Sequence, residues 1–142
     1  MKIILNLINI LIVLILFNTP VIAGENFFSQ GKAFYEKKNL KKAKFKFEQD
    51  IVFNPKNELS YLYLAKIYNK EKNFDKEEIN LNTVLLLDPQ NEEATYDLIS
   101  LNILKSDFSN AQKYLDNFTK ICKRLCNKKT LAENKLKDSL KR

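Results

Sequence analysis

The sequence lacks histidine and tryptophan altogether, and its 142 residues include only two Cys, two Gly and three Pro. Without histidine the chain cannot build a Ser-His-Asp or Cys-His nucleophile, and it cannot bind a metal through imidazole. Two glycines are too few for the Gly-rich loops that hold phosphates in dinucleotide and P-loop sites. We therefore expect no catalytic activity, no resident cofactor or metal, and no small-molecule substrate.

Arginine is also scarce, since 22 of the 24 basic residues are lysine. Arginine recognises phosphates and bases through paired hydrogen bonds, so the formal net charge of +7 does not indicate a nucleic-acid partner. The positive charge gathers in residues 32–46, with seven Lys, and in residues 120–142, with nine Lys and Arg. Residues 47–119 hold seven Lys against thirteen acids. The basic segments predict at most a weak contact with an anionic membrane surface, or an attraction for an acidic partner.

An apolar run opens the chain. Residues 3–17 are almost entirely apolar, with Lys2 before them and Pro20 after them. Ala23 ends a short Val-Ile-Ala segment of the kind that a signal peptidase cuts, so residues 1–23 are predicted to be a secretory signal peptide. Cleavage would place the remaining chain in a bacterial periplasm or a comparable space. The alternative is an uncleaved N-terminal membrane anchor, although a spanning helix usually needs about 20 apolar residues.

A 34-residue period organises the rest of the chain. Pro55 and Pro89 are one period apart, and turn-forming and apolar residues recur with the same step. Apolar residues spaced i, i+4, i+7, and Asn residues followed by acids in the first turn, predict two helices in each period. No stretch alternates apolar and polar residues as a half-buried strand would, so we expect an all-α fold. The recurring sets include Asn39, Asn73 and Asp107 at one position, and Phe47, Leu81 and Leu115 at another.

Three of these periods resemble the tetratricopeptide repeat (TPR), a helix-turn-helix unit with aromatic, small and terminal Pro residues at set positions. Lys123 stands where the third Pro is expected, and Asp50 and Glu77 stand in slots for small residues. At Glu77 we expect either an outward tilt of the side chain or a local distortion of the repeat. The matching residues are Phe27, Gly31, Phe34, Ala43, Phe47 and Pro55 in the first repeat, Tyr61, Leu64, Ala65, Tyr68, Val84 and Pro89 in the second, and Leu98, Ala111 and Leu115 in the third.

The resemblance implies a right-handed α-solenoid of three repeats, at residues 24–57, 58–91 and 92–125. Residues 126–142 then form a basic amphipathic helix that caps the last repeat, because a solenoid needs a cover for its exposed end. The predicted apolar stripe of this cap consists of Leu125, Leu131, Leu136 and Leu140.

TPR proteins are similar in using the first helices of their repeats to line a groove that holds a peptide or protein segment. Lysine, amide and aromatic side chains in such a groove predict an extended ligand with an acidic group or a C-terminal carboxylate. The alternative is that these lysines are ordinary solvated charges. Carried onto this sequence, the groove residues are Phe28, Lys32, Tyr35, Leu62, Lys66, Asn69, Tyr96, Ser100 and Ile103.

Cys122 and Cys126 are the only cysteines, and they bracket the turn between the third repeat and the capping helix. In an exported chain two cysteines usually join, so we expect a small disulfide staple. The alternatives are free thiols and a Cu(I) site made of two thiolates. The predicted function is therefore a non-catalytic scaffold or adaptor of the bacterial envelope. A thiol- or copper-handling assembly factor and a protein held at the membrane surface by its N-terminal helix are the alternatives.

Overall fold

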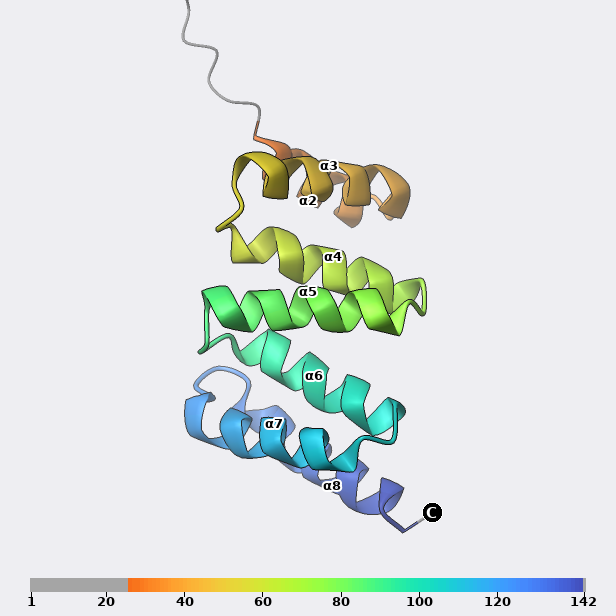
Figure 1. The fold of residues 1–142 in the computed structure, drawn as a ribbon, viewed down its shortest axis with the longest axis vertical. Coiled ribbons are helices and arrows are strands. Elements are labelled where there is room, and N and C mark those ends of the chain that lie inside the picture. The colour runs from red at the N-terminus through yellow and green to blue at the C-terminus, as the bar shows by residue number, and fades with distance from the viewer. Residues whose placement is uncertain (1–25, 142) are drawn as a thin grey trace, which may run out of the picture.

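The computed structural model describes residues 26–141, and the predicted signal peptide at residues 1–23 lies outside them. The described residues form helices and turns with no strand. In Figure 1 the helices follow one another from top to bottom, and each packs against its neighbours in the chain. The predicted all-α solenoid is confirmed. The helices are α2 (Phe27–Glu36), α3 (Leu40–Phe53), α4 (Glu58–Lys70), α5 (Phe74–Leu87), α6 (Glu92–Leu104), α7 (Phe108–Ile121), the 3-10 turn η1 (Cys126–Lys128) and α8 (Lys129–Ser139).

The turn inside each repeat has the same construction. Asn39, Asn73 and Asp107 each accept the backbone N–H of the residue three positions on, which satisfies a free donor at the start of the second helix. The residue before each cap has a positive φ: Lys38 at 58°, Lys72 at 55° and Ser106 at 59°. This left-handed backbone strains any residue other than glycine. Each turn therefore carries the same local cost.

The second helices also end in register. The backbone N–H groups of Asn54, Asp88 and Cys122 donate to the carbonyls four residues earlier, and Asp88 and Cys122 leave helical geometry for an extended backbone. Pro55 follows the first of these residues and favours such a backbone before it. The helix end at Cys122 needs no Pro, so the departure at Lys123 does not disturb the repeat.

The interior contains a cluster of buried apolar side chains at each level of the solenoid. The first level depends on a close approach of α2 to α3 at Gly31. A Cβ atom there would lie 2.7 Å from the Phe47 ring, which is fully buried and has no room to retreat. The small residue predicted at this position is therefore required by packing.

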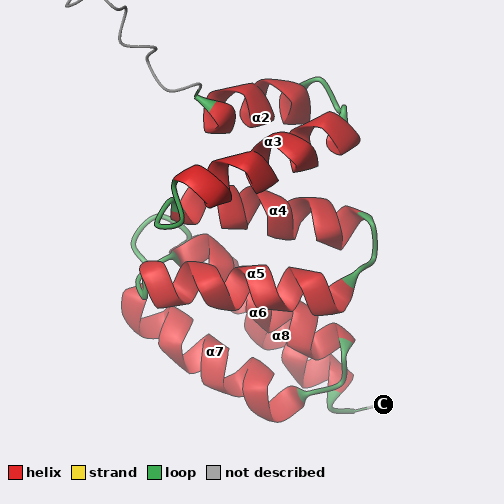
Figure 2. Ribbon diagram, turned by 45° about the horizontal axis from the view of Figure 1, so that its top comes forward, coloured by secondary structure: helices red, strands yellow, loops and turns green. Residues whose placement is uncertain are grey.

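The last helix covers the end of the solenoid as predicted, but with a different apolar stripe. Ala132 and Leu136 are buried against α6 and α7, and Figure 2 shows α8 lying beside α6. Leu131 and Leu140 remain 50% and 61% exposed, so their assignment to the stripe was wrong. Ala132 packs against the core in place of its neighbour Leu131.

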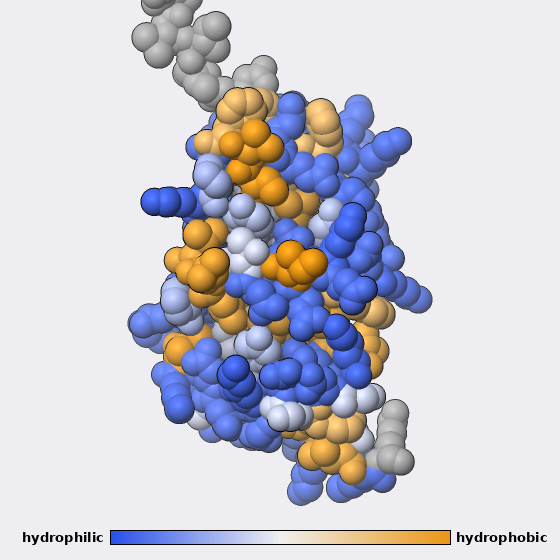
Figure 3. All heavy atoms as spheres, viewed as in Figure 1, coloured by the Kyte–Doolittle hydropathy of each residue, from blue (hydrophilic) through white to orange (hydrophobic). Residues whose placement is uncertain are grey.

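The outward faces of α3 and α5 carry exposed apolar side chains. Phe45 and Val52 lie seven residues apart on α3, and Ile79 and Leu86 hold the equivalent positions on α5. Figure 3 shows orange patches over these two helices on an otherwise mostly polar face. In the described residues no helix is both long enough and apolar enough to span a bilayer.

Candidate functional site

A hollow of about 270 Å³ lies where the first helices of the three repeats meet, and we call it the α4–α6 groove. It brings together four of the residues predicted for a binding groove, one from α2, two from α4 and one from α6. The lining residues are Tyr35, Lys66, Asn69, Lys70, Glu77, Glu93, Asp97 and Ser100.

The other predicted residues do not line this groove. Leu62 is only 4% exposed and belongs to the core, so its placement in the groove was wrong. Phe28 packs against the Phe47 and Tyr63 rings. Tyr96 and Ile103 pack against the C-terminal core cluster, and Lys32 is exposed outside the hollow. Phe28, Leu62 and Tyr96 share one position of the repeat, and this position packs against the core at all three levels.

Three acidic residues that the sequence analysis did not place in the groove also line it, namely Glu77, Glu93 and Asp97. Glu93, Asp97 and Ser100 are spaced i, i+4, i+7 on α6, which is the signal that could have placed them on one face. Glu77 reaches the groove from α5, at the position where Ala43 and Ala111 stand in the other repeats. The groove is therefore acidic rather than basic.

Glu77 neither tilts outward nor sits in distorted backbone; it points into the groove while remaining 3% exposed. Its Oε1 atom accepts a hydrogen bond of 2.9 Å from the Asn69 amide. Its Oε2 atom is buried and has no hydrogen-bond partner. Burial disfavours the charged form and raises the pKa of the Glu77 carboxyl, while the Asn69 hydrogen bond opposes that rise.

Both lysines of the groove are already engaged. Lys66 Nζ lies 2.8 Å from Glu93 Oε1, in an ion pair that joins α4 to α6. Lys70 Nζ lies 4.4 Å from the centre of the Tyr35 ring, in a cation–π contact. Neither ammonium group is hydrogen-bonded to Glu77 or Asp97.

Asp97 is the titratable group of the groove with the largest perturbation. Burial raises its pKa to about 6, and the negative charges of Glu93 and Glu77 add to the rise. The positive charge of Lys66 counteracts it only in part. Within the part of the chain that the structure describes, no Lys or Arg lies within 4 Å of the Asp97 carboxylate.

At the α2–α4 junction, one repeat earlier, an uncharged residue holds the position of Asp97. Tyr63 is the residue equivalent to Asp97 one period earlier. Its ring stacks on Phe47 at 5.0 Å and meets Tyr35 edge to face at 5.1 Å. Aromatic packing therefore closes the α2–α4 junction. The carboxylate of Asp97 leaves the α4–α6 junction hollow and polar.

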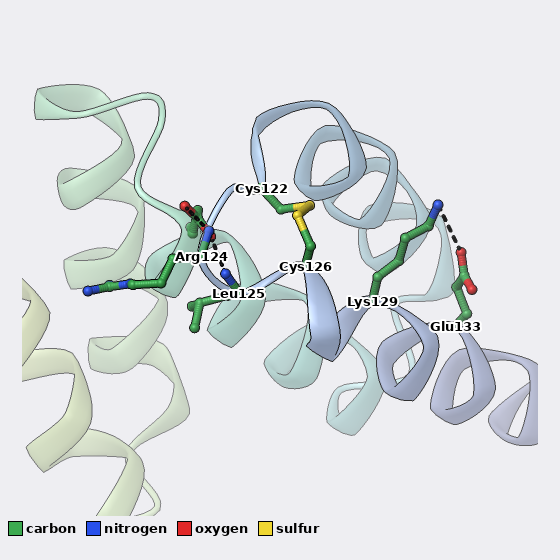
Figure 4. The surroundings of a disulfide bond; sticks show 7 residues. Cys122, Arg124, Leu125, Cys126, Lys129 and Glu133 are labelled. Carbon is green, nitrogen blue, oxygen red and sulfur yellow. Dashed lines mark hydrogen bonds and ion pairs between the residues drawn. A yellow bond between two sulfur atoms is a disulfide. The ribbon is translucent and has the colours of Figure 1, made fainter.

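The cysteines form a separate feature at the C-terminal turn. Cys122 ends α7 and is joined by a disulfide to Cys126, at the start of η1. Figure 4 shows this bridge beside Arg124 and Leu125, whose backbone N–H groups donate to the Glu92 carboxylate of α6. These hydrogen bonds lower the pKa of Glu92. With both sulfurs in the bridge neither is a thiolate, and in residues 26–141 no cluster of three or more acidic or Cys side chains could hold a metal.

Comparisons with known proteins find likeness at the level of structure. No family model and no curated protein matches the sequence. The TPR domain of Arabidopsis OM64 has a TM-score of 0.72 and 21% identity, over 82% of this chain and 95% of that one. The TPR2B domain of yeast Sti1, in a complex with pHsp70, has a TM-score of 0.70 and 17% identity, over 82% and 95%.

A bacterial structure is similar to the same degree. The Yersinia enterocolitica type III secretion chaperone SycD, in complex with a peptide of the translocator YopD, has a TM-score of 0.70. The identity is 14%, over 81% of this chain and 90% of that one. Together with the 34-residue register, the caps and the helix pairs, these likenesses show that the described chain has the tetratricopeptide repeat fold.

Proposed function

We propose that this chain is a non-catalytic interaction module, a scaffold or adaptor that binds a peptide or protein segment in the α4–α6 groove. The observation that carries the proposal is the groove itself: a hollow bounded by three repeats, whose polar groups are not all satisfied within the chain. The SycD and Sti1 structures support it, because they are complexes of this fold with a YopD peptide and with pHsp70.

We infer further that the module works in the periplasm or envelope of a bacterium. The signal-like composition of residues 1–23 supports export. The Cys122–Cys126 disulfide is consistent with it, because disulfides persist in oxidising compartments and are rare in the cytosol. The intact mass of the chain isolated from its host tests this. Loss of residues 1–23 is expected, and a full-length mass would contradict cleavage.

Site-specific cross-linking tests the groove. A photo-reactive amino acid replaces Lys70 at the groove or Lys113 on the exposed surface of α7, in otherwise identical full chains. Irradiation in the native host should give a discrete cross-linked product from position 70 and none from position 113. Equal products from both positions, or none from position 70, would rule out the groove as the binding surface.

A further inference from the structure

The α4–α6 groove has a shortage of positive charge. Glu93 is neutralised by Lys66, and Lys70 lies on the Tyr35 ring. This leaves the carboxylates of Glu77 and Asp97 facing the same hollow without a cation. Like charges that share a partly buried site repel each other unless an opposite charge is placed between them.

Glu77 is the clearest indication that a donor comes from outside the chain. The side chain lines the groove, and its buried Oε2 atom has no hydrogen-bond partner within the described residues, although buried carboxylate oxygens are almost always paired. Ala43 and Ala111 hold the equivalent positions in the other repeats, so packing of the fold does not require a carboxylate here. An unpaired carboxylate at such a position fits a binding role.

We propose that the α4–α6 groove receives a basic side chain, Lys or Arg, of the bound segment, with Glu77, Asp97 and Ser100 as its hydrogen-bond acceptors. The proposal rests on the proposed function, because the bound segment supplies the side chain. A Lys ammonium has three donors, and an Arg guanidinium has five. The Ser100 hydroxyl donates to the Tyr96 carbonyl at 3.3 Å, which leaves its oxygen able to accept.

The geometry favours an organic cation over a metal ion. Within the described part of the chain, no three acidic or Cys side chains converge closely enough to coordinate a metal. The groove does not suit the acidic ligand that its lysines predicted, because Lys66 is held by Glu93 and the groove is acidic. A basic side chain adds the missing positive charge and displaces no existing ion pair.

The affinity for a cation should depend on pH through Asp97. The charged groups that face it are Glu93 on its own helix, Lys66 on α4, Glu77 on α5 and Lys128 on η1. The pKa of Asp97 is about 6, so its negative charge is lost as the pH falls below that value. A bound cation favours the ionised form, so cation binding should weaken as the pH is lowered from 7 to 5.

The test uses small analogues of the side chains and the purified, isotope-labelled full chain. Its NMR spectrum is followed during titration with n-butylammonium, methylguanidinium or butyrate at constant ionic strength. The first two probes should give saturable shifts at the amides of Glu77, Asp97 and Ser100, and butyrate should not. The two cationic probes also show whether the groove prefers a Lys-type or an Arg-type group.

Variants tie the response to the proposed acceptors. Glu77→Gln and Asp97→Asn should each weaken n-butylammonium binding about tenfold, as expected for loss of a charge-assisted hydrogen bond. Asp75→Asn is the matched control, because it removes one carboxylate from a highly exposed position on α5. It should leave the affinity unchanged, and an equal loss in this variant would show that the effect is only overall charge.

The outcomes separate this inference from the proposed function. If position 70 cross-links a partner but neither cationic probe shifts the groove amides, the basic-ligand inference fails and the interaction module stands. If the cations bind but no partner is captured, the cation site stands and the proposed function fails. Saturable shifts with butyrate at the same amides would overturn the inference outright.

Discussion

Asp50 and Glu77 are both almost fully buried carboxylates, at 2% and 3% exposure, yet their surroundings are opposite. The Asp50 oxygens accept hydrogen bonds from Asn54 at 3.0 Å, Asn57 at 2.6 Å and Ser60 at 2.6 Å. Glu77 receives one hydrogen bond and keeps an unpaired oxygen. Both residues replace side chains that are buried and apolar in the other repeats, namely Val84 and Phe118 for Asp50, and Ala43 and Ala111 for Glu77.

The difference separates a structural carboxylate from a binding carboxylate. Of the three donors around Asp50, Asn54 and Asn57 lie in the connection between the first two repeats and Ser60 lies in α4, so this side chain fixes α4 against α3. The Asn57 side chain donates to Asp50 and forms no cap hydrogen bond to the start of its own helix, α4. Nothing comparable surrounds Glu77, whose side chain lines the groove and whose second oxygen has no hydrogen-bond partner. The same replacement of carboxylate by amide should therefore have opposite effects at the two sites.

Asp50→Asn should show the largest effect. The new amide group places a donor among three donors, which breaks at least one hydrogen bond and leaves buried polar atoms unpaired. We expect the free energy of unfolding to fall by about 3 kcal/mol. Chemical denaturation of the wild type and the variant measures it. A loss below about 1 kcal/mol would mean that the network contributes little.

Asp97→Asn should act in the other direction. The rise of its pKa from 3.8 to about 6 corresponds to about 3 kcal/mol. The side chain is partly exposed, so we expect a gain of about 2 kcal/mol in unfolding free energy at pH 7 after solvent screening.

The sign of the pH dependence checks this prediction. Between pH 3.8 and about 6 the folded chain holds a proton on Asp97 that the unfolded chain has released. The unfolding free energy of the wild type should therefore fall as the pH rises through this window, relative to the variant. Denaturation curves at pH 4, 5, 6 and 7 would show it, and parallel curves would contradict the assigned burial.

Glu77→Gln should produce the smallest change, a gain of about 1 kcal/mol at pH 7, because it removes a buried charge and keeps the acceptor for Asn69. Its melting temperature should rise while binding of n-butylammonium weakens. A stability loss like that of Asp50→Asn would show that both carboxylates are structural and remove the distinction between them.

The sequence predicted the periodic part of the molecule well. The second helix of each repeat begins after Asn39, Asn73 or Asp107, whose side chains form local cap hydrogen bonds. Because such cap residues recur every 34 residues, the sequence alone locates these helix starts. The register also placed the cysteine pair at a turn, because Cys122 aligns with the helix-ending Asn54 and Asp88. The disulfide itself was expected because two cysteines in an exported chain usually join.

The groove was predicted only in part, because its character depends on features that spacing does not carry. Leu62 packs into the core, and the repeat register alone did not show that its position faces inward. The pairing of Lys66 with Glu93 crosses from one repeat to the next and reverses the expected sign of the groove. Glu77 stood out as a departure from the repeat pattern, yet only the fold shows that its oxygen lacks a partner.

The strained turns at Lys38, Lys72 and Ser106 have a consequence for how this protein can change over time. Glycine at any of them would relieve a left-handed backbone and stabilise the fold by about 1 kcal/mol. In a solenoid each repeat contacts chiefly its neighbours, so such gains should add almost independently. The stability cost of substitutions in the groove that alter ligand choice can thus be offset at three sites that do not line it.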